Sequence, residues 1–439
     1  MRCVRNRLGV MKYVVWGGGQ LGRKAVSIIG KGKIALWVDT NSELQGAEIN
    51  GIKVESPDAI KTIEEKFIIL ITPAAYEEQI ARELELEEYY NYFYFSDHPY
   101  CMDMSDEADS IRVLDYLPRF DGTILLYGIN WFNLYLYDFF KIRGEKAIIY
   151  ASGKEYDYFY ELIKDDYEVT SDEIHIASAN HIFAPIDIKG LPTEKTKVID
   201  ELIEEACPIS HPEVSKYKNI YKGKRCFIVA TGPSLKVDDL DKINANGDIS
   251  ISMNRIYNIF DRTLWRPDYY VIEDQKMIED LAPTIAKLDL KTKFVSENPQ
   301  SYWEQPEAET SIPYKMVMQD CLSSRIGFSL NPDRIMYNGY SVTYVCLQLA
   351  VYMGFSEIYL IGVDFNYSSD VYAESNHFEG YQGHYKDIRL NPIEPERMKR
   401  AYQKARVVSE AKGIHIFNAT RGGKLEVFER VDLDKILDV

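Results

Sequence analysis

The chain has 439 residues, of which 46% are hydrophobic and 27% charged, a composition typical of a globular protein with two or three domains. Its formal net charge of −17 argues against nucleic-acid binding, which needs clustered Lys and Arg along a groove. The six Cys form no C-x-x-C pair, so no zinc ribbon or redox pair is indicated. No apolar run of about 18 residues is present, and we expect a cytoplasmic protein without a transmembrane span.

Strands and helices alternate between residues 11 and 99. The segment KYVVWGGGQLGRKAVSII predicts a strand, a glycine-rich turn and a helix, and KIALWVDTN predicts a second strand that ends in an acidic residue. A helix (SPDAIKTIEE), a strand (KFIILITP), another helix (AAYEEQIARELE) and a last strand (NYFYFSD) follow. This alternation predicts a parallel, Rossmann-like sheet with right-handed crossovers.

The first turn of this module carries a dinucleotide-binding fingerprint. Gly17, Gly19 and Gly22 match G-x-G-x-x-G between a strand and a helix, and Asp39 ends the second strand. The glycines would let a phosphate approach backbone N–H groups at the start of the helix, and Asp39 would bind ribose hydroxyls. The same turn also occurs in domains that bind sugar nucleotides or no catalytic ligand, so the nature of the ligand stays open.

The middle region, residues 100–221, has weaker motifs. TILLYGINW and KAIIYAS predict strands, and EYDYFYELIKDDY predicts a helix. The region is either an independent domain or a bridge of mixed α/β structure, and its polar, basic end, HPEVSKYKNIYKGKR, is typical of a linker. The overall expectation is therefore an α/β protein with two Rossmann-like parallel-sheet modules joined by this region.

Residues 222–439 predict the second Rossmann-like module. KRCFIVATGPSLKVDDLDKI predicts a strand, a turn and a helix, and further strands are expected in DISISMNRIYNIF, DYYVIEDQ and KTKFVSENP. A strongly apolar helix, SVTYVCLQLAVYMGF, should end at Gly354, and a buried strand, SEIYLIGVDFNY, should follow it. A charged helix, EPERMKRAYQKARVVSEAKG, and a last strand, IHIFNAT, complete the module. Cys226 and Cys346 lie in apolar runs and should be core residues.

The turn after the first strand of this module predicts a phosphate or ribose site. Thr231 and Gly232 follow the strand; Gly232 allows a tight turn, Pro233 presets φ for a helix start, and Ser234 should cap that helix. N–H groups at such a turn face the carboxyl ends of the strands, where ligands of parallel sheets bind. An ordinary capped turn without a ligand remains the alternative.

A second group of polar residues is expected at the same edge. Asp364 follows a strongly apolar strand, where a carboxylate is expected to have a role in binding or catalysis. The alternative is a structural Asp that caps the next loop. The loop that follows holds two of the seven His, His377 and His384, and His is the natural base near neutral pH. Metal binding by both is an alternative that their spacing favours less. Further on, Arg421 and Lys424 could close over an anionic ligand.

The co-linear set ATGPSL, SMNR, MGFSEIYLIGVDFNY and SNHF resembles bacterial CMP-sialic-acid sialyltransferases. It also resembles the domain shared by motility-associated flagellin glycosyltransferases and archaeal 6-hydroxymethylpterin diphosphokinases. The resemblance implies roles for the following residues: nucleotide or substrate binding for Thr231, Asn254, Asp274, Ser341 or Thr343, Asn366 and Tyr367; phosphate binding for Tyr372; catalysis for His377 or His384. Thr231 and the Glu273–Asp274 pair depart from the family pattern, which has Asn at both places.

The amino-terminal module has a resemblance of its own. VDTNSELQGAEINGIKVESPDAI is similar to the amino-terminal domain of sugar O- and N-acyltransferases of the sialic-acid and bacillosamine pathways, which binds an amino-sugar nucleotide there. The hexapeptide repeats of the acyltransferase domain are absent from this sequence. Acyl transfer is therefore not implied.

The resemblances imply an inverting, metal-independent glycosyltransferase. It would need no cofactor beyond a nucleotide-sugar donor, a CMP-sugar such as CMP-nonulosonic acid first among them, and would act on a glycan or protein acceptor. One alternative is an ATP-dependent pterin pyrophosphokinase that requires Mg²⁺, and a third is a non-catalytic nucleotide-sugar-binding protein. The sequence is compatible with a homo-oligomer and with a position at the inner face of a membrane.

Overall fold

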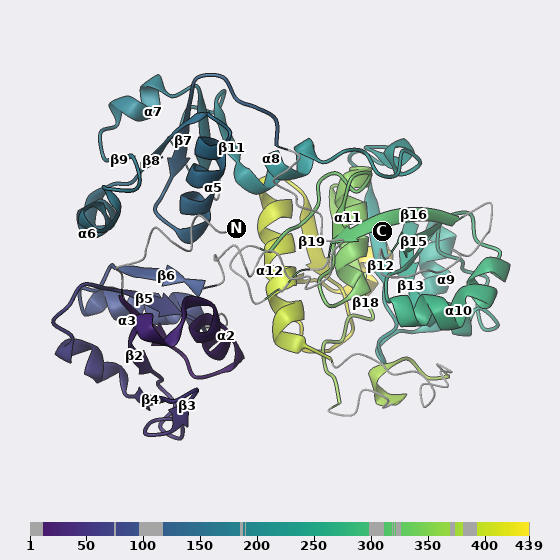
Figure 1. The fold of residues 1–439 in the computed structure, drawn as a ribbon. Helices are drawn as coiled ribbons and strands as arrows, with labels where there is room; N and C mark the ends of the chain where they lie inside the picture. Colours follow the sequence, from purple (N-terminus) through teal and green to yellow (C-terminus); the bar gives the residue numbers. More distant parts are fainter. Residues whose placement is uncertain are drawn as a thin grey trace. The chain divides into compact units, whose positions relative to one another are not determined.

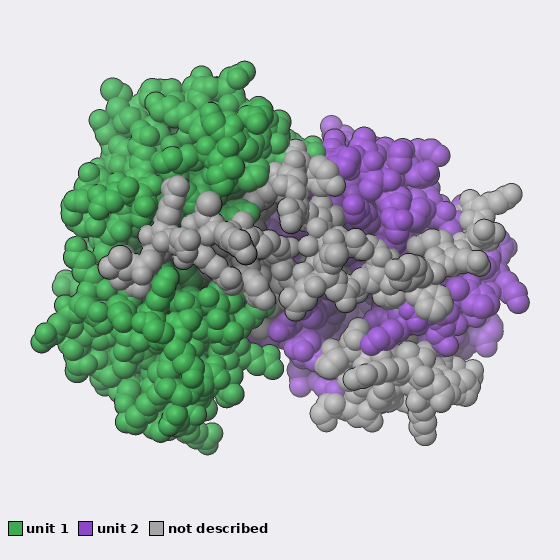
Figure 2. Space-filling view, in the orientation of Figure 1, with its two compact units in different colours: residues 1–206, 322–325 green, residues 207–321, 326–439 purple. Residues whose placement is uncertain are grey.

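The computed structural model describes residues 12–73, 76–95, 117–184, 188, 190–297, 311–317, 319, 321, 326–368, 374–380 and 393–438. The chain divides into two compact units, Met1–Ala206 with Leu322–Arg325, and Cys207–Cys321 with Ile326–Val439 (Figure 2). We refer to them as unit 1 and unit 2. No helix in the described ranges is long and apolar enough to cross a membrane.

Unit 1 begins with a six-stranded sheet in the order β3-β4-β2-β1-β5-β6 (Figure 1). Its strands are β1 (Lys12–Trp16), β2 (Ile34–Val38), β3 (Glu48–Ile49), β4 (Ile52–Glu55), β5 (Phe67–Ile71) and β6 (Tyr92–Tyr94). All described pairs are parallel except β3 with β4. The helices are α2 (Gln20–Ile29), the 3₁₀ turns η1 (Lys31–Lys33) and η2 (Pro57–Thr62), and α3 (Glu77–Leu86). The helix expected in SPDAIKTIEE is only the short η2.

The middle region forms a parallel sheet of its own within unit 1, in the order β11-β10-β7-β8-β9. Its strands are β7 (Thr123–Tyr127), β8 (Lys146–Tyr150), β9 (Val169–Thr170), β10 (His181–Ala184) and β11 (Thr196–Val198). Its helices are α5 (Trp131–Ile142), α6 (Gly153–Ile163), α7 (Ile174–Ser178) and α8 (Ile199–Ala206). The first strand lies between the second and the fourth, which is the doubly wound order. The region that the sequence left open is thus a third Rossmann-like sheet.

Aromatic side chains join the two sheets of unit 1 into one core. The Tyr13 and Trp131 rings lie 6.4 Å apart between their centroids, and the Phe93 and Phe159 rings are stacked at 4.8 Å. These four side chains are all buried and belong to the same apolar cluster. Each buried aromatic removes a large apolar surface from water, so this cluster accounts for the two sheets behaving as one unit.

Unit 2 is built on a nine-stranded sheet in the order β17-β16-β15-β14-β13-β12-β18-β19-β20. Its strands, all paired in parallel, are β12 (Arg225–Val229), β13 (Ile249–Met253), β14 (Tyr269–Ile272), β15 (Lys293–Glu297), β16 (Ser311–Val317), β17 (Met336–Tyr337), β18 (Glu357–Ile361), β19 (His415–Asn418) and β20 (Glu429–Arg430). The helical elements are η6 (Val214–Tyr217), α9 (Val237–Asn246), η7 (Asn254–Ile259), α10 (Gln275–Lys287), α11 (Val342–Met353), η8 (Glu374–Asn376), α12 (Pro395–Ala411) and α13 (Leu433–Leu437).

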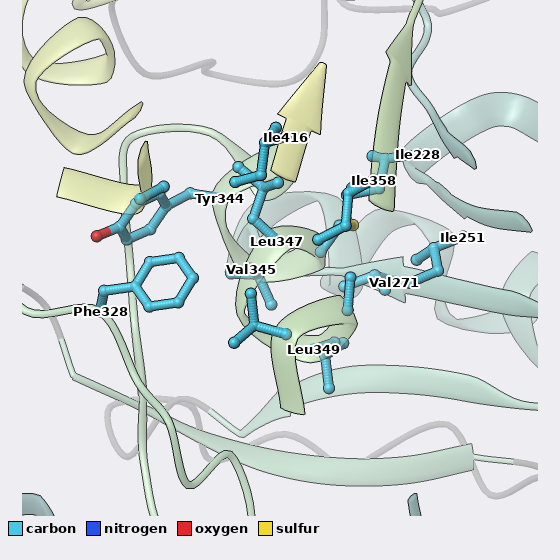
Figure 3. Packing of buried hydrophobic residues seen from close by; sticks show 14 of the residues in the cluster. Ile228, Ile251, Val271, Phe328, Tyr344, Val345, Leu347, Leu349, Ile358 and Ile416 are labelled. Atoms are coloured by element: carbon cyan, nitrogen blue, oxygen red, sulfur yellow. The ribbon is translucent and has the colours of Figure 1, made fainter. Parts of the chain in front are cut away.

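Two helical layers cover the sheet of unit 2. Helix α11 packs on one face, where Val345, Leu347 and Leu349 meet the inward side chains of neighbouring strands (Figure 3). Helices α9, α10 and α13 pack on the other face. Helix α11 is buried from Thr343 to Met353 and ends at Gly354, whose φ of 87° confirms the predicted left-handed cap. Cys226 and Cys346 are fully buried, as predicted.

The segment expected to be a linker packs instead against the end of α11. Val214 is fully buried, and the N–H groups of Asn219 and Tyr221 donate to the carbonyls of Tyr352 and Met353 at 3.0 and 2.9 Å. Val214, Tyr217 and Tyr221 are buried or partly buried between exposed basic residues. The polar composition of the segment as a whole therefore led to the incorrect prediction of a linker. The bounds of the three predicted domains stay a prediction.

Candidate functional site

The candidate site of unit 2 lies where the parallel strands of its sheet end. Strand β12 pairs with β13 on one side and with β18 on the other, so the strand order reverses at β12, which is the topological switch point of the sheet. Ligands of doubly wound sheets bind outside the carboxyl ends of the strands at such a point. The residues that follow these strands are Thr231 and Gly232 after β12, Asn254 after β13, Glu273 and Asp274 after β14, and Asp364 beyond β18.

Gly232 lies directly against Asp364. A Cβ atom on Gly232 would be 2.2 Å from Oδ2 of Asp364 and 2.4 Å from the carbonyl oxygen of Gly362, so no larger residue fits there without rearrangement. The turn after β19 also packs against Asp364. A Cβ on Gly423, which has a φ of 75°, would be 2.5 Å from the carbonyl oxygen of Asp364. The turns after β12, β18 and β19 therefore pack around a single residue.

Ser234 binds Asp364 rather than capping a helix. Its N–H and its hydroxyl donate to Oδ2 of Asp364 at 3.2 and 2.8 Å. Helix α9 begins later, at Val237, with Lys236 as its N-cap, so the predicted cap is wrong. Burial raises the pKa of Asp364, while the bonds from Ser234 act in the opposite direction. Pro233 is exposed in the turn between them.

His377 lies next to the same turn. Its Nδ1 is 3.4 Å from Oγ1 of Thr231, and the N–H of Phe378 donates to the carbonyl of Thr231 at 3.0 Å. Burial lowers the pKa of His377 to about 4, and the nearby positive charge of Arg255 contributes in the same direction. The imidazole is therefore neutral at physiological pH, which is the form that can accept a proton.

Asn254 occupies the end of the neighbouring strand in an unusual backbone conformation. Its φ is 51°, in the left-handed region that costs most residues other than Gly, Asn and Asp free energy. Its carbonyl accepts a hydrogen bond from the Tyr270 hydroxyl at 2.7 Å. Strand β13 ends at Met253 and η7 begins at Asn254, so Asn254 lies at the carboxyl end of the strand.

Ser341 and Thr343 lie at the start of α11, on one face of the sheet. Ser341 is the N-cap but makes no side-chain capping bond; instead its Oγ accepts from the Tyr402 hydroxyl at 3.0 Å. Thr343 is buried and its hydroxyl points to Sδ of Met253 at 3.5 Å. Tyr367 is close enough to Tyr402 and Asp364 for their charges to add to the burial that raises its pKa.

The remaining sequence predictions in unit 2 have mixed outcomes. Asn366 is exposed. Asp274 caps α10, where its side chain accepts from the N–H of Met277 at 3.0 Å. Tyr372 and His384 lie outside the described residues, and their assignments stay predictions. Among the residues that the structure describes, no three His, Cys, Asp or Glu side chains gather into a metal site.

Arg421 does not reach toward a ligand. Its guanidinium makes paired hydrogen bonds of 2.6–2.9 Å to the carboxylates of Asp239 and Asp434, and these bonds raise its pKa. The residue links α9 to α13, and its expected role over an anion is wrong. The N–H of Lys424 donates to the carbonyl of Asp364 at 2.7 Å.

The amino-terminal fingerprint in unit 1 folds as a compact turn. The N–H of Gly18 donates to Oδ2 of Asp39 at 2.6 Å, so this carboxylate is engaged by the loop itself. A Cβ on Gly22 would lie 1.9 Å from the carbonyl oxygen of Gly17, which explains the third glycine of the motif by close packing of helix and strand. Gly19 is the N-cap of α2, so the helix starts without a side-chain cap. Gly17 and Asp39 are thus neighbours, as the motif requires.

One residue that sequence reasoning did not select is Glu273. It follows β14 and is only 9% exposed, and burial together with the charge of Asp274 raises its pKa to about 8. In the described part of the chain, its Oε2 has no hydrogen-bond partner. The sequence signal was the departure from Asn in the family pattern, which showed a difference but not that the carboxyl is buried.

Comparison with known proteins agrees with one of the families that the motifs resemble. Residues 200–370 match the family described as 6-hydroxymethylpterin diphosphokinase MptE-like. These residues make up less than half of the chain and include the ends of β12, β13, β14 and β18. Residues 9–92 match the family described as C2185-like, N-terminal, so the resemblance to acyltransferase domains stays a prediction.

Similarity to individual proteins is low. The chain resembles the solved structure of the MAf glycosyltransferase from Magnetospirillum magneticum AMB-1 with 16% identity and a TM-score of 0.34. The comparison covers 71% of this chain and 58% of that one. No curated protein sequence matches the chain.

Proposed function

We propose that unit 2 is a glycosyltransferase that uses a nucleotide-activated sugar. The observation that carries the proposal is the convergence of the turns after β12, β18 and β19 on Asp364, beside the contact of Thr231 with His377. These turns lie at the carboxyl ends of the strands, where ligands of doubly wound sheets bind. A donor lying there would have its phosphate over Gly232 and its sugar toward Asp364 and His377.

The chemistry would be an inverting displacement that needs no divalent metal. Neutral His377 accepts the proton of the acceptor hydroxyl through Nε2, while its Nδ1 side is held by Thr231. The acceptor oxygen then attacks the anomeric carbon, and the bond from that carbon to the phosphate oxygen breaks. The hydroxyls of Tyr367 and Tyr372 stabilise the leaving phosphate. The motifs favour a CMP-nonulosonic acid as donor and a glycan or protein as acceptor.

A second candidate function is favoured by the family match. A 6-hydroxymethylpterin diphosphokinase transfers diphosphate from ATP to a pterin hydroxyl, and the matched residues, 200–370, include most of the site. That reaction would require Mg²⁺ and carboxylate ligands, for which Asp364, Asp370 and Glu374 are candidates; Asp370 lies outside the described residues. A protein that binds nucleotide sugars without turnover is the third alternative.

A single set of assays separates these functions. The full chain is incubated with CMP-, UDP- and GDP-sugars and with ATP plus 6-hydroxymethylpterin, each with Mg²⁺ or with EDTA. We expect release of nucleotide from one sugar donor, unaffected by EDTA. The variant His377→Ala should lose turnover and keep nucleotide binding, whereas His415→Ala, on an exposed residue at the other end of β19, should change neither. AMP release that depends on Mg²⁺, or full turnover in His377→Ala, would contradict the proposal.

A further inference from the structure

Glu273 is a buried carboxyl group at the end of β14. Only 9% of its surface is exposed, and no described residue hydrogen-bonds its Oε2. A buried carboxyl oxygen without a hydrogen-bond partner is destabilising, and such groups in native proteins call for an explanation. The residue stands at the carboxyl end of β14, two strands away from β12, on the edge where the candidate site lies.

Among the described residues, Asp274 is the charge that acts on Glu273, and it is negative. Alternation along β14 puts Glu273 on the α11 face, with Tyr269 and Val271. The titratable groups that it influences there are Tyr314 on β16, Cys346 on α11 and Tyr402 on α12; the other charge that acts on it is Asp274. The pKa values of the two tyrosines and the cysteine are all raised by burial, so these groups stay neutral. A carboxyl in such a place keeps its proton at neutral pH.

The order of the strands says what part of a nucleotide would reach Glu273. In doubly wound sheets the phosphate binds at the turn after the first strand, and the ribose binds at the end of the second. These positions are Gly232 and Asn254 in unit 2. Neighbouring strands are about 4.8 Å apart, so a nucleotide that continues in the same direction places its base at the end of the third strand, β14.

We infer that Glu273 recognises the base of the bound nucleotide by pairing its carboxyl group with the edge of that base. A protonated carboxyl has a hydrogen-bond donor and an acceptor side by side, and every nucleobase presents the same pair of functions along its edge. The pairing would satisfy Oε2 and would take no ion from water. The inference rests on the proposed function for the nucleotide but not on the transfer reaction.

Two variants of Glu273 separate recognition from a structural role. Gln also offers a donor and an acceptor side by side, so Glu273→Gln should keep affinity within about threefold. Glu273→Ala should weaken nucleotide binding by about tenfold or more, the effect of one lost hydrogen-bonding group. Glu297→Gln is the matched control, because Glu297 ends the neighbouring strand β15 but is half exposed and pairs with His211 at 2.8 Å. It should leave affinity unchanged.

The measurement is calorimetric titration of the full chain with CMP, UMP, AMP and GMP, and with ribose 5-phosphate as a probe without a base. Glu273→Ala should weaken binding of the preferred nucleotide and leave ribose 5-phosphate unaffected. Wild-type affinity should fall about tenfold from pH 7 to pH 9 as the carboxyl loses its proton, and Glu273→Gln should show no such fall. Circular dichroism verifies that the variants are folded.

Each outcome has one meaning. An equal loss for nucleotide and ribose 5-phosphate in Glu273→Ala, no loss at all, or wild-type affinity that rises with pH would overturn the inference. If sugar transfer occurs and nucleotide affinity does not change in Glu273→Ala, the inference about the base is wrong but the proposed function stands. Nucleotide binding that depends on Glu273 without any transfer would support the inference and contradict the proposed function.

Discussion

Replacing Glu273 by Gln should make the stability of unit 2 less dependent on pH. The pKa of Glu273 is about 8 in the folded protein, against an ordinary value of 4.5, because the side chain is buried. The folded state therefore holds a proton that the unfolded state releases between these two values. The free energy of unfolding contributed by this group is fully present below pH 4.5 and is lost as the pH rises to about 8.

The size of the effect follows from the two pKa values. One pKa unit corresponds to about 1.4 kcal/mol, so the difference between 4.5 and about 8 corresponds to about 5 kcal/mol. Gln does not titrate. The contributions of all other titratable groups to the free energy of unfolding cancel when the variant is compared with the wild type. Relative to the wild type, Glu273→Gln should therefore gain about 5 kcal/mol of stability between pH 4.5 and pH 8.5.

Hydrogen exchange of the α11 amides is the suitable assay, because it reports on unit 2 without mixing in the unfolding of unit 1. The free energy of opening is measured for both proteins at several pH values, after correction for the intrinsic exchange rate. Parallel curves for the wild type and the variant across the whole range would refute the reasoning, since they would mean that Glu273 is ionised in the folded state.

Three further predictions concern the same unit. Gly232→Ala should destabilise the protein by about 1–3 kcal/mol and abolish nucleotide binding, because the added Cβ meets Asp364; Gly32→Ala, where nothing lies within 4 Å, is the control in a melting experiment. The acid limb of a kcat/KM profile should lie near pH 4, where His377 gains its proton, and a limb near pH 6.5 would argue against this base. Arg421→Lys should cost about 1–2 kcal/mol in urea unfolding, because Lys cannot bind Asp239 and Asp434 in the paired geometry; no change would mean the links are dispensable.

Most elements of unit 2 could be predicted from the sequence because they are locally determined. A short apolar run such as EIYLI that ends in polar residues is typical of a buried strand, and the long apolar helix that ends at Gly354 has its cap in the sequence. The sheet of the middle region was harder to predict. Its strands β9 and β11 have two and three residues, and the return of β10 to the side of β7 is set by packing between distant segments.

Site residues whose position follows from the end of their own strand were predicted from the sequence. Residues whose role depends on a partner far away in the sequence were not. Gly232 and Asp364 were placed correctly at one edge from the pattern of their own segments. Ser234 was taken for a cap because its partner lies 130 residues away, and Arg421 was taken for a ligand-binding residue because Asp239 lies 182 residues away. Glu273 lies close enough to Tyr314, Cys346 and Tyr402 to influence their pKa values, and no local pattern brings these distant segments together.

The most direct test of the account is a crystal structure of the full chain grown with whichever nucleotide raises its melting temperature most. We predict density for the phosphate at the turn that holds Gly232, for the ribose beside Asn254, and for the base against Glu273. A nucleotide bound elsewhere on the chain, with the ends of β12, β13 and β14 left in contact with solvent alone, would contradict the central claim.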